Sequence, residues 1–126
     1  MGAFVISKKN NGEYKFTFAT RRGKTVITSI GCKQKSDCER IIEALRENVM
    51  QFTFTQIRQP SGKYFFRISK DGLVLGNSRK FTTQLLMQKG LNDFLERAAS
   101  TETLDFSEQE FLFGNSEEAE YESKII

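Results

Sequence analysis

The chain has 126 residues, a hydrophobic content of 38%, twelve Phe, no Trp and no His, and a formal net charge of +3. A chain of this length makes one domain, or two small units that share a core. No apolar run reaches the roughly eighteen residues that a membrane helix needs, and the N-terminus lacks the pattern of a secretory signal. We therefore expect a cytoplasmic protein that does not cross a membrane.

The charge is unevenly distributed along the chain. Residues 1–51 carry ten Lys and Arg against five Asp and Glu, and residues 52–99 carry eight against three. Residues 100–126 carry one Lys and eight acidic residues. A basic body therefore precedes an acidic tail.

The first half of the chain predicts three strands and a helix. In GEYKFTF (Gly12–Phe18), apolar and polar residues alternate as in a half-buried strand. The flanking NNG and RRG are typical of hairpin turns, and KTVITS follows as a further strand. Ser36 and Glu39 predict a capping box at the start of a helix. Its apolar residues recur with helical spacing, namely Cys38, Ile41, Ile42, Leu45 and Val49.

The second half repeats this order. FTFTQIR, KYFFRIS and LVLGNS are predicted strands, and a helix is predicted from about Thr83. Gly90 lies on the inward stripe of this helix, which predicts a close approach to another element, because Gly costs about 1 kcal/mol against Ala in a helix. The rest of the stripe is Met87, Leu91, Phe94 and Ala98, with Leu95 beside it. A last strand at Glu102–Phe106 is expected to pair back into the sheet, with Leu104 and Phe106 inward.

The two halves align residue by residue, with an offset of 50 before a turn that loses one residue (TRRG against KDG) and 49 after it. We interpret this alignment as an internal duplication, with repeats at about 3–50 and 52–106. The predicted fold class is α+β: two tandem β-β-β-α(-β) repeats that form one continuous antiparallel sheet with both helices on one face. Joining the two open edges would protect them.

The alignment also predicts the role of the two cysteines. Cys32 aligns with Phe81 and Cys38 with Met87, so we expect both to be small hydrophobic core residues. A zinc site would need further ligands, and the chain has no His.

The repeated pattern is Gly-x-Tyr-x-Phe-x-Phe, then a Gly turn and a Ser that ends the third strand. It is carried by Gly12, Tyr14, Phe16, Phe18, Gly23 and Ser29, then Gly62, Tyr64, Phe66, Ile68, Gly72 and Ser78, with Gly90 and Leu91 in the second helix. This package resembles the YegP-like tandem-repeat family, small bacterial proteins of unknown function. The resemblance covers about residues 3–106 and implies one sheet with exchanged terminal strands. It implies no functional residues. The chain departs from the pattern at Ile30, Arg79 and Ile41.

We expect a small non-catalytic binding or structural module with no catalytic, cofactor-binding or metal-binding residues. Without His, the commonest general base is absent, and no glycine-rich loop for a phosphate is present. The carboxylates of the body are expected to be solvated, in turns or on outward helix faces; they are Glu13, Asp37, Glu39, Glu43, Glu47, Asp71, Asp93 and Glu96.

The alternative is that the face of the sheet away from the helices binds single-stranded nucleic acid. Basic residues interleaved with an exposed aromatic, here Phe65, neutralise phosphates and stack on bases. The same pattern is also typical of a solvated polar face. The candidate residues are Lys15, Thr17, Lys63, Phe65, Arg67 and Ser69.

The acidic tail, residues 107–126, is expected to be a partly disordered, solubilising extension. A sharper hypothesis is that EFLF (Glu110–Phe113) docks on the body, where the acidic residues shield its basic surface. A third class of function is a protein-interacting element that forms a weak homodimer through an unpaired sheet edge. The sequence leaves two questions open: whether the partner is a nucleic acid or a protein, and whether the chain is a monomer with internal pseudo-symmetry or a weak homodimer.

Overall fold

The computed structural model describes residues 2–108. The strands are β1 (Ala3–Lys8), β2 (Tyr14–Ala19), β3 (Thr25–Ser29), β4 (Thr53–Arg58), β5 (Tyr64–Lys70), β6 (Leu73–Ser78) and β7 (Glu102–Asp105). The helices are α1 (Lys35–Glu47) and α2 (Gln84–Arg97), followed by the short 3-10 turns η1 (Val49–Gln51) and η2 (Ala98–Ser100). Three strands and a helix thus occur in each half, as the sequence predicts.

All seven strands of the described chain form one sheet in the order β4-β5-β6-β3-β2-β1-β7. Neighbouring strands are antiparallel, except that β7 runs parallel to β1. The fold is therefore α+β with a mixed sheet, and the prediction of a purely antiparallel sheet is wrong at this edge. The parallel pair arises because the chain crosses over from α2, in the second half, to the edge strand of the first half.

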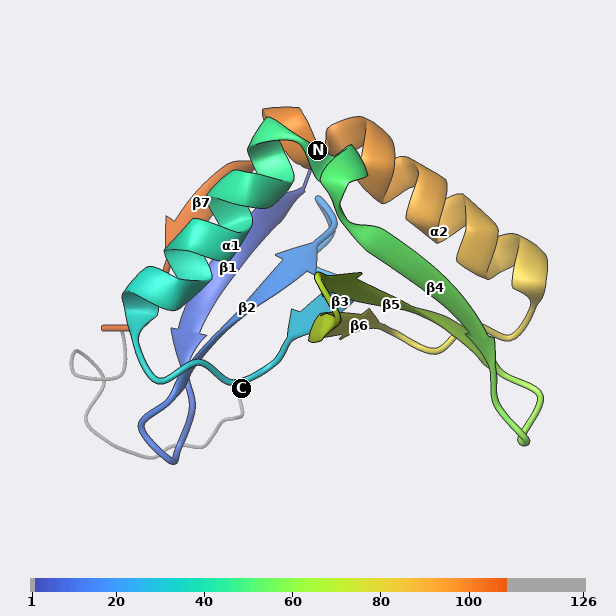
Figure 1. The fold of residues 1–126 in the computed structure, drawn as a ribbon, viewed down its shortest axis with the longest axis horizontal. Helices are drawn as coiled ribbons and strands as arrows, with labels where there is room; N and C mark the ends of the chain where they lie inside the picture. Colours follow the sequence, from blue (N-terminus) through green and yellow to red (C-terminus); the bar gives the residue numbers. More distant parts are fainter. Residues whose placement is uncertain (1, 109–126) are drawn as a thin grey trace.

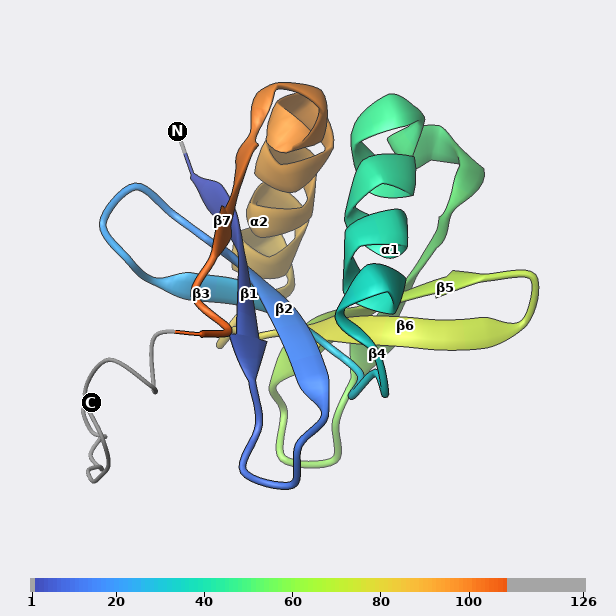
Figure 2. The same ribbon diagram turned by 90° about the vertical axis from the view of Figure 1, so that its left-hand side faces the viewer.

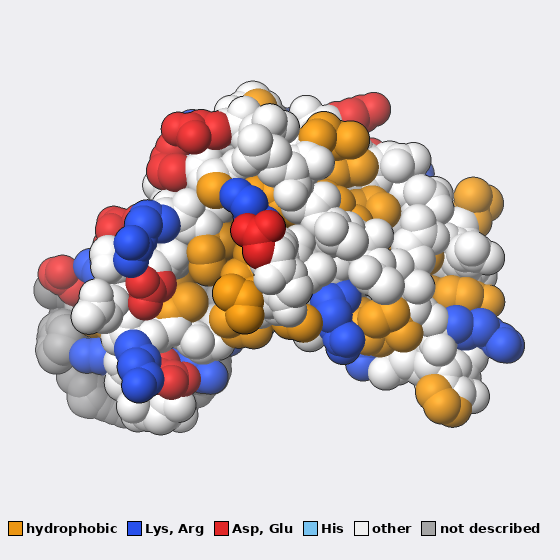
Figure 3. Space-filling model, viewed as in Figure 1, with side chains coloured by type: hydrophobic (Ala, Val, Ile, Leu, Met, Phe, Trp, Pro, Cys, Tyr) orange, Lys and Arg blue, Asp and Glu red, His pale blue; other side chains and the backbone are white. Residues whose placement is uncertain are grey.

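Both helices cover the same face of the sheet, as predicted (Figures 1 and 2). The sheet arches beneath them, with the β1–β2 and β4–β5 hairpins at its two ends (Figure 1). The other face, which we call the helix-free face, is hollowed between these ends (Figure 3). Because successive side chains of a strand point to opposite faces, each strand contributes alternately to the core and to this hollow.

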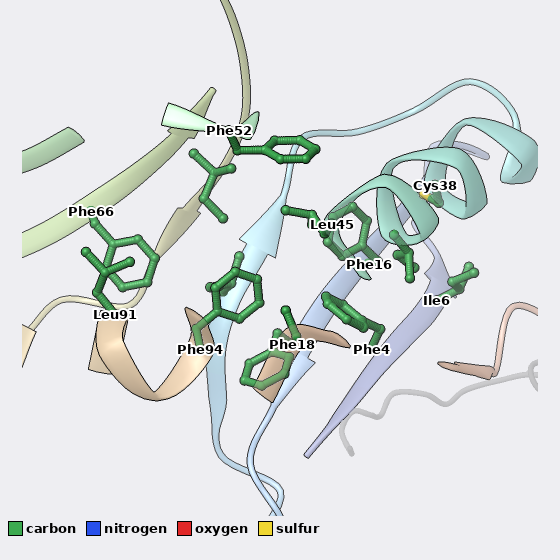
Figure 4. Close-up of a cluster of buried hydrophobic side chains, with 14 of the residues drawn as sticks. Phe4, Ile6, Phe16, Phe18, Cys38, Leu45, Phe52, Phe66, Leu91 and Phe94 are labelled. Atoms are coloured by element: carbon green, nitrogen blue, oxygen red, sulfur yellow. The ribbon is translucent and has the colours of Figure 1, made fainter. Parts of the chain in front are cut away.

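The hydrophobic core lies between the sheet and the two helices (Figure 4). Its largest fully buried side chains include Phe4 and Phe16 of the first half and Phe66 and Phe94 of the second. The helices contribute Cys38, Ile42 and Leu45 from α1 and Met87, Leu91 and Phe94 from α2. Cys32 and Cys38 belong to this cluster with free thiols, so their prediction as core residues is confirmed.

Strand β7 has the opposite orientation from the one predicted. Thr103 lies opposite Phe4 of β1, and Leu104 lies opposite Val5. Directly opposed residues share a face, so Thr103 points toward the helices and Leu104 toward the helix-free face. Phe106 is 47% exposed. The prediction that Leu104 and Phe106 point inward is therefore wrong.

Polar contacts form on the helix side of β7. Asp105 is placed on the helix side, where its carboxylate accepts a hydrogen bond from Lys35 Nζ, 3.0 Å away at the start of α1. The Ser107 hydroxyl, which is buried, donates to the same carboxylate at 2.6 Å. These contacts hold the pKa of Asp105 below its ordinary value, chiefly through Ser107.

The start of α1 also differs from the prediction. The N-cap is Gln34, without a side-chain cap, and the Ser36 hydroxyl bonds to the Gln34 side chain at 3.3 Å. The predicted capping box of Ser36 and Glu39 is therefore wrong, because the helix begins one residue before Ser36. In α2, by contrast, the Thr83 hydroxyl accepts a bond from Leu86 N at 3.1 Å.

The predicted domain boundary at residue 106 stays a prediction. Ser107 and Glu108 are described, and Lys35 pairs with Glu108 as well as with Asp105. The proposed docking of EFLF lies outside the described residues.

Candidate functional site on the helix-free face

The predicted binding residues occupy two separate strands of the helix-free face. Lys15 and Thr17 lie on β2, where their neighbours Phe16 and Phe18 are buried in the core. Phe65 and Arg67 lie on β5, and Lys63 comes just before this strand. The alternation therefore sends all five away from the core, as expected.

The sheet register shows which of these residues come together. In the sheet register, Arg67 of β5 lies opposite Asn77 of β6, and Asn77 lies opposite Thr28 of β3. Thr28 in turn lies opposite Thr17 of β2. One row thus crosses the face from β5 to β2. Lys15 lies two residues from Thr17, and strands β6 and β3 separate it from β5. The structure therefore brings Phe65 and Arg67 together, but places Lys15 and Thr17 apart from them.

Phe65 is only 7% exposed, so the prediction of an exposed aromatic is wrong. Two cations cover its ring: the Arg67 guanidinium lies 5.7 Å from the ring centroid and Lys80 Nζ lies 5.1 Å from it. On the adjacent strand its direct neighbour is Ile57. A ring covered in this way offers no open face on which a base could stack.

Lys80 was missed from the sequence because it lies beyond the end of β6, in a segment that carries no alternating pattern. An isolated bridge between Tyr64 and Phe81 extends the pairing there and brings Lys80 alongside Phe65. Arg67 Nε also donates to the Asn77 side-chain oxygen at 3.0 Å. We call Phe65, Arg67, Asn77 and Lys80 the β5–β6 cation cluster.

Ion pairs are distributed very unevenly between the two halves. All five pairs found in residues 2–108 use cations of the first half, namely Lys9, Lys35, Arg40 and Arg46. Within the same described residues, none of the eight cations of 52–99 forms an ion pair. Four of them lie over aromatic rings instead: Arg67 and Lys80 at Phe65, Lys70 at Phe52 and Arg79 at Phe81. The second half therefore presents cations that form no ion pair within the described residues.

The two thiols are poorly suited to nucleophilic chemistry. Burial raises the pKa of the Cys38 thiol from its ordinary value of 9.0 to about 12, and the adjacent Cys32 thiol adds to the rise. Burial likewise raises the pKa of Cys32. A thiol must ionise to act as a nucleophile, so both are kept in their unreactive form.

The pKa of Cys38 predicts a dependence of stability on alkaline pH. The folded state holds the neutral thiol, so the unfolded state ionises first, and the stabilisation is lost as pH rises from about 9 toward about 12. We expect the difference in urea midpoint between the wild type and Cys38→Ala to shrink between about pH 7.5 and about pH 10.5. A difference that stays constant over this range would contradict the assignment.

Within residues 2–108, no group of three or more His, Cys, Asp or Glu side chains is arranged to hold a metal ion. Neither helix of this part of the chain is long and apolar enough to cross a membrane.

The described residues define a small α+β protein with a seven-stranded mixed sheet, whose helix-free face carries the β5–β6 cation cluster. No protein-family model matches the chain. In sequence it is 24% identical over 107 residues to the UPF0339 protein in the ptx operon 5' region of Stutzerimonas stutzeri, covering 82% of this chain and 96% of that protein. It is 25% identical over 92 residues to the UPF0339 protein YegP of Escherichia coli K12, covering 71% and 84%.

The solved structures agree with the sequence matches. The solution structure of YegP from E. coli, described as a protein of unknown function, matches with a TM-score of 0.76 at 20% identity, over 91% of this chain and 96% of that one. The UPF0339 protein SO3888 of Shewanella oneidensis matches with a TM-score of 0.74 at 19% identity, over 84% and 92%. The resemblance to YegP-like proteins, small bacterial proteins of unknown function, is thereby confirmed.

Proposed function

We propose that the protein is a non-catalytic binding module that takes an anionic partner on its helix-free face. The observation that carries the proposal is the β5–β6 cation cluster, in which Arg67 and Lys80 share one aromatic ring without a carboxylate partner in the described residues. Two like charges held on one side of the sheet attract a phosphate or carboxylate strongly. The ring and the bond from Arg67 to Asn77 also limit the freedom of the guanidinium before any ligand arrives.

Among polyanions, a nucleic acid is the alternative partner that we propose, but its mode of binding would differ from the base stacking that the sequence predicts. Since Phe65 is covered, affinity would come from phosphate contacts and not from base stacking. Such binding is independent of sequence and falls steeply as salt rises, because each neutralised phosphate releases a counterion. Preference for single strands over duplexes should therefore be small.

The test is the fluorescence anisotropy of a labelled single-stranded oligonucleotide at low salt. The double variant Arg67→Ala, Lys80→Ala should weaken binding by about tenfold, because two phosphate contacts are lost. The matched control is Arg40→Ala, Lys89→Ala, which removes the same charge from the helices α1 and α2 on the opposite face. Absence of binding by the wild type, or an equal loss in both double variants, contradicts the proposal.

We also propose that the chain is a tandem repeat. In support, Ile27 pairs with Ser78, Thr28 with Asn77 and Ser29 with Gly76 across the β3–β6 junction. With the offset of 49, Thr28 thus pairs with its own counterpart, which is the relation of a two-fold axis. Ser29 and Ser78 accept equivalent bonds from Phe16 N at 2.8 Å and Phe66 N at 2.9 Å.

A second candidate function uses the edge of the sheet. Strand β7 covers the outer edge of β1, whereas β4, the counterpart of β1, is the opposite end of the sheet order. An uncovered edge strand pairs with extended chains, including the same edge of a second copy. Sedimentation equilibrium over a concentration range tests the homodimer: a rising mean mass supports it, and a constant monomer mass contradicts it. A cytoplasmic location, where the free thiols Cys32 and Cys38 would persist, is part of this proposal.

A further inference from the structure

A pocket of about 440 Å³ opens between α2 and the tip of the β2–β3 hairpin. It lies on the helix side of the sheet, so it is separate from the helix-free face. Both ribbon views place the hairpin tip near the N-terminal end of the described chain (Figures 1 and 2). The lining residues are Gly2, Phe18, Thr20, Arg21, Arg22, Val26, Gly90, Asp93 and Arg97.

The equivalent space, between α1 and the β5–β6 hairpin, is bordered by larger side chains. The counterpart of Gly2 is Phe52, whose ring is 7% exposed, belongs to the core cluster and lies under Lys70 Nζ at 5.2 Å. The counterpart of Gly90 is Ile41, which packs against the same cluster. The pocket therefore has glycines at two lining positions where the equivalent space, between α1 and the β5–β6 hairpin, has a Phe and an Ile.

The surrounding atoms leave no room for a side chain at Gly2 or at Gly90. A Cβ on Gly2 would collide with the carbonyl oxygen of Ala19, and a Cβ on Gly90 would lie 2.9 Å from the Phe81 ring. A real Cβ essentially never approaches another atom so closely. Both glycines are therefore required by close packing at the wall of the pocket.

The charged residues also distinguish the pocket from its counterpart. Arg21 and Arg22 lie in the turn TRRG, which is one residue longer than its counterpart KDG. Arg97 and Asp93 of α2 correspond to Asn48 and Ala44 of the first half. None of the three arginines forms an ion pair within residues 2–108. Three arginines and one aspartate therefore line the opening.

We propose that this pocket binds a small organic anion, with a phosphate or carboxylate held by Arg21, Arg22 and Arg97 and a compact apolar body against Phe18 and Val26. Guanidinium groups bind both anions through paired hydrogen bonds. The volume lies in the range of small-molecule pockets, which are mostly apolar with a few polar groups that orient the ligand. Asp93 disfavours excess negative charge and can accept a bond from a hydroxyl or amine of the ligand.

The test is a fluorine NMR titration of the full chain with three aromatic probes and inorganic phosphate. We expect binding of para-fluorophenyl phosphate and para-fluorobenzoate, of which the tighter identifies the anion. Inorganic phosphate should compete at least about tenfold more weakly, because it lacks the apolar body. Neutral para-fluorobenzyl alcohol should bind weakest of the aromatic probes.

Variants then connect binding to the pocket. Arg97→Gln should weaken the aryl anion by about tenfold through the loss of a charge-assisted bond, and Asp93→Asn should strengthen it by a few fold through the loss of repulsion. Lys24→Gln is the matched control, since it removes a cation from the same hairpin but does not line the pocket. All variants change exposed residues, and an unchanged melting temperature confirms their folding.

Two results would overturn the proposal: no binding of either aryl anion by the wild type, or equal weakening by Arg97→Gln and Lys24→Gln. The double variant Arg67→Ala, Lys80→Ala should leave the binding of the aryl anions unchanged. A loss in that variant would show that the probes bind the helix-free face and not the pocket. Failure of the pocket and failure of the polyanion surface are therefore distinguishable.

Discussion

Phe81→Cys and Gly90→Ile should each destabilise the protein, and the two together should recover much of the loss. A Cβ added to Gly90 would lie 2.9 Å from Cζ of the Phe81 ring. At the equivalent positions, the first half has Cys32 and Ile41. A large ring thus packs against a glycine in one half, whereas a small thiol faces a branched side chain in the other.

The expected magnitudes follow from this packing. Gly90→Ile alone forces overpacking against Phe81 and should cost about 2 kcal/mol. Phe81→Cys alone removes a ring that is 8% exposed and should cost about 3 kcal/mol. In the double variant the Ile side chain occupies the space that the ring vacates. The loss in the free energy of unfolding should therefore be about 2 kcal/mol smaller than the sum of the two single losses.

Urea unfolding of the four proteins measures this coupling as a double-mutant cycle. The matched control is the reverse exchange in the first half, Cys32→Phe with Ile41→Gly, which should show a coupling of the same sign. Costs that add within about 0.5 kcal/mol would show that the two positions are independent and would contradict the reciprocal packing.

Phe94→Ala should be the most damaging single truncation, with a loss of about 4 kcal/mol in the free energy of unfolding. The Phe94 ring is fully buried in the second half. It makes edge contacts with Phe4 at 6.2 Å and Phe18 at 4.9 Å from the first half, and with Phe54 at 6.1 Å from its own. The variant therefore removes aromatic contacts between the two halves, which the β3–β6 pairing also joins, so both should melt together at a lower temperature.

Phe106→Ala is the control for this truncation. The sequence predicts Phe106 to be inward, but it is 47% exposed, so its loss should change the free energy of unfolding by less than about 1 kcal/mol. Thermal and chemical unfolding of both variants check the pair. Equal losses would mean that the assignment of faces at the C-terminal strand is wrong.

The core and the order of elements could be predicted from the sequence because both depend on local patterns. The alternation around Phe16 and Phe66 and the helical spacing around Ile42 and Leu91 each reveal a buried face. The cysteines were assigned correctly because the alignment placed each of them opposite a larger apolar residue. Gly90, too, indicated a close contact, although only the structure identifies Phe81 as its partner.

The errors concern positions where partners distant in the chain decide. In β7 it is Thr103 and Asp105 that take the helix side, where Asp105 pairs with Lys35 seventy residues away, so the apolar residues Leu104 and Phe106 do not point inward. Lys80 covers Phe65, because an isolated bridge between Tyr64 and Phe81 holds the two segments side by side. No alternating pattern in the sequence predicts this bridge. The pocket is lined by Arg21 of a turn and Arg97 at the end of a helix, and only the fold brings these two distant segments together.

The differences between the halves thus form the pocket, whereas the residues they share form the core. The most direct test is an amide NMR spectrum of the isotope-labelled chain with and without para-fluorophenyl phosphate. We predict shifts at Thr20, Arg21 and Arg97, and none at the residues that align with them, Lys70, Asp71 and Asn48. Equal shifts in the two sets, or shifts confined to the helix-free face around Arg67, would contradict the account.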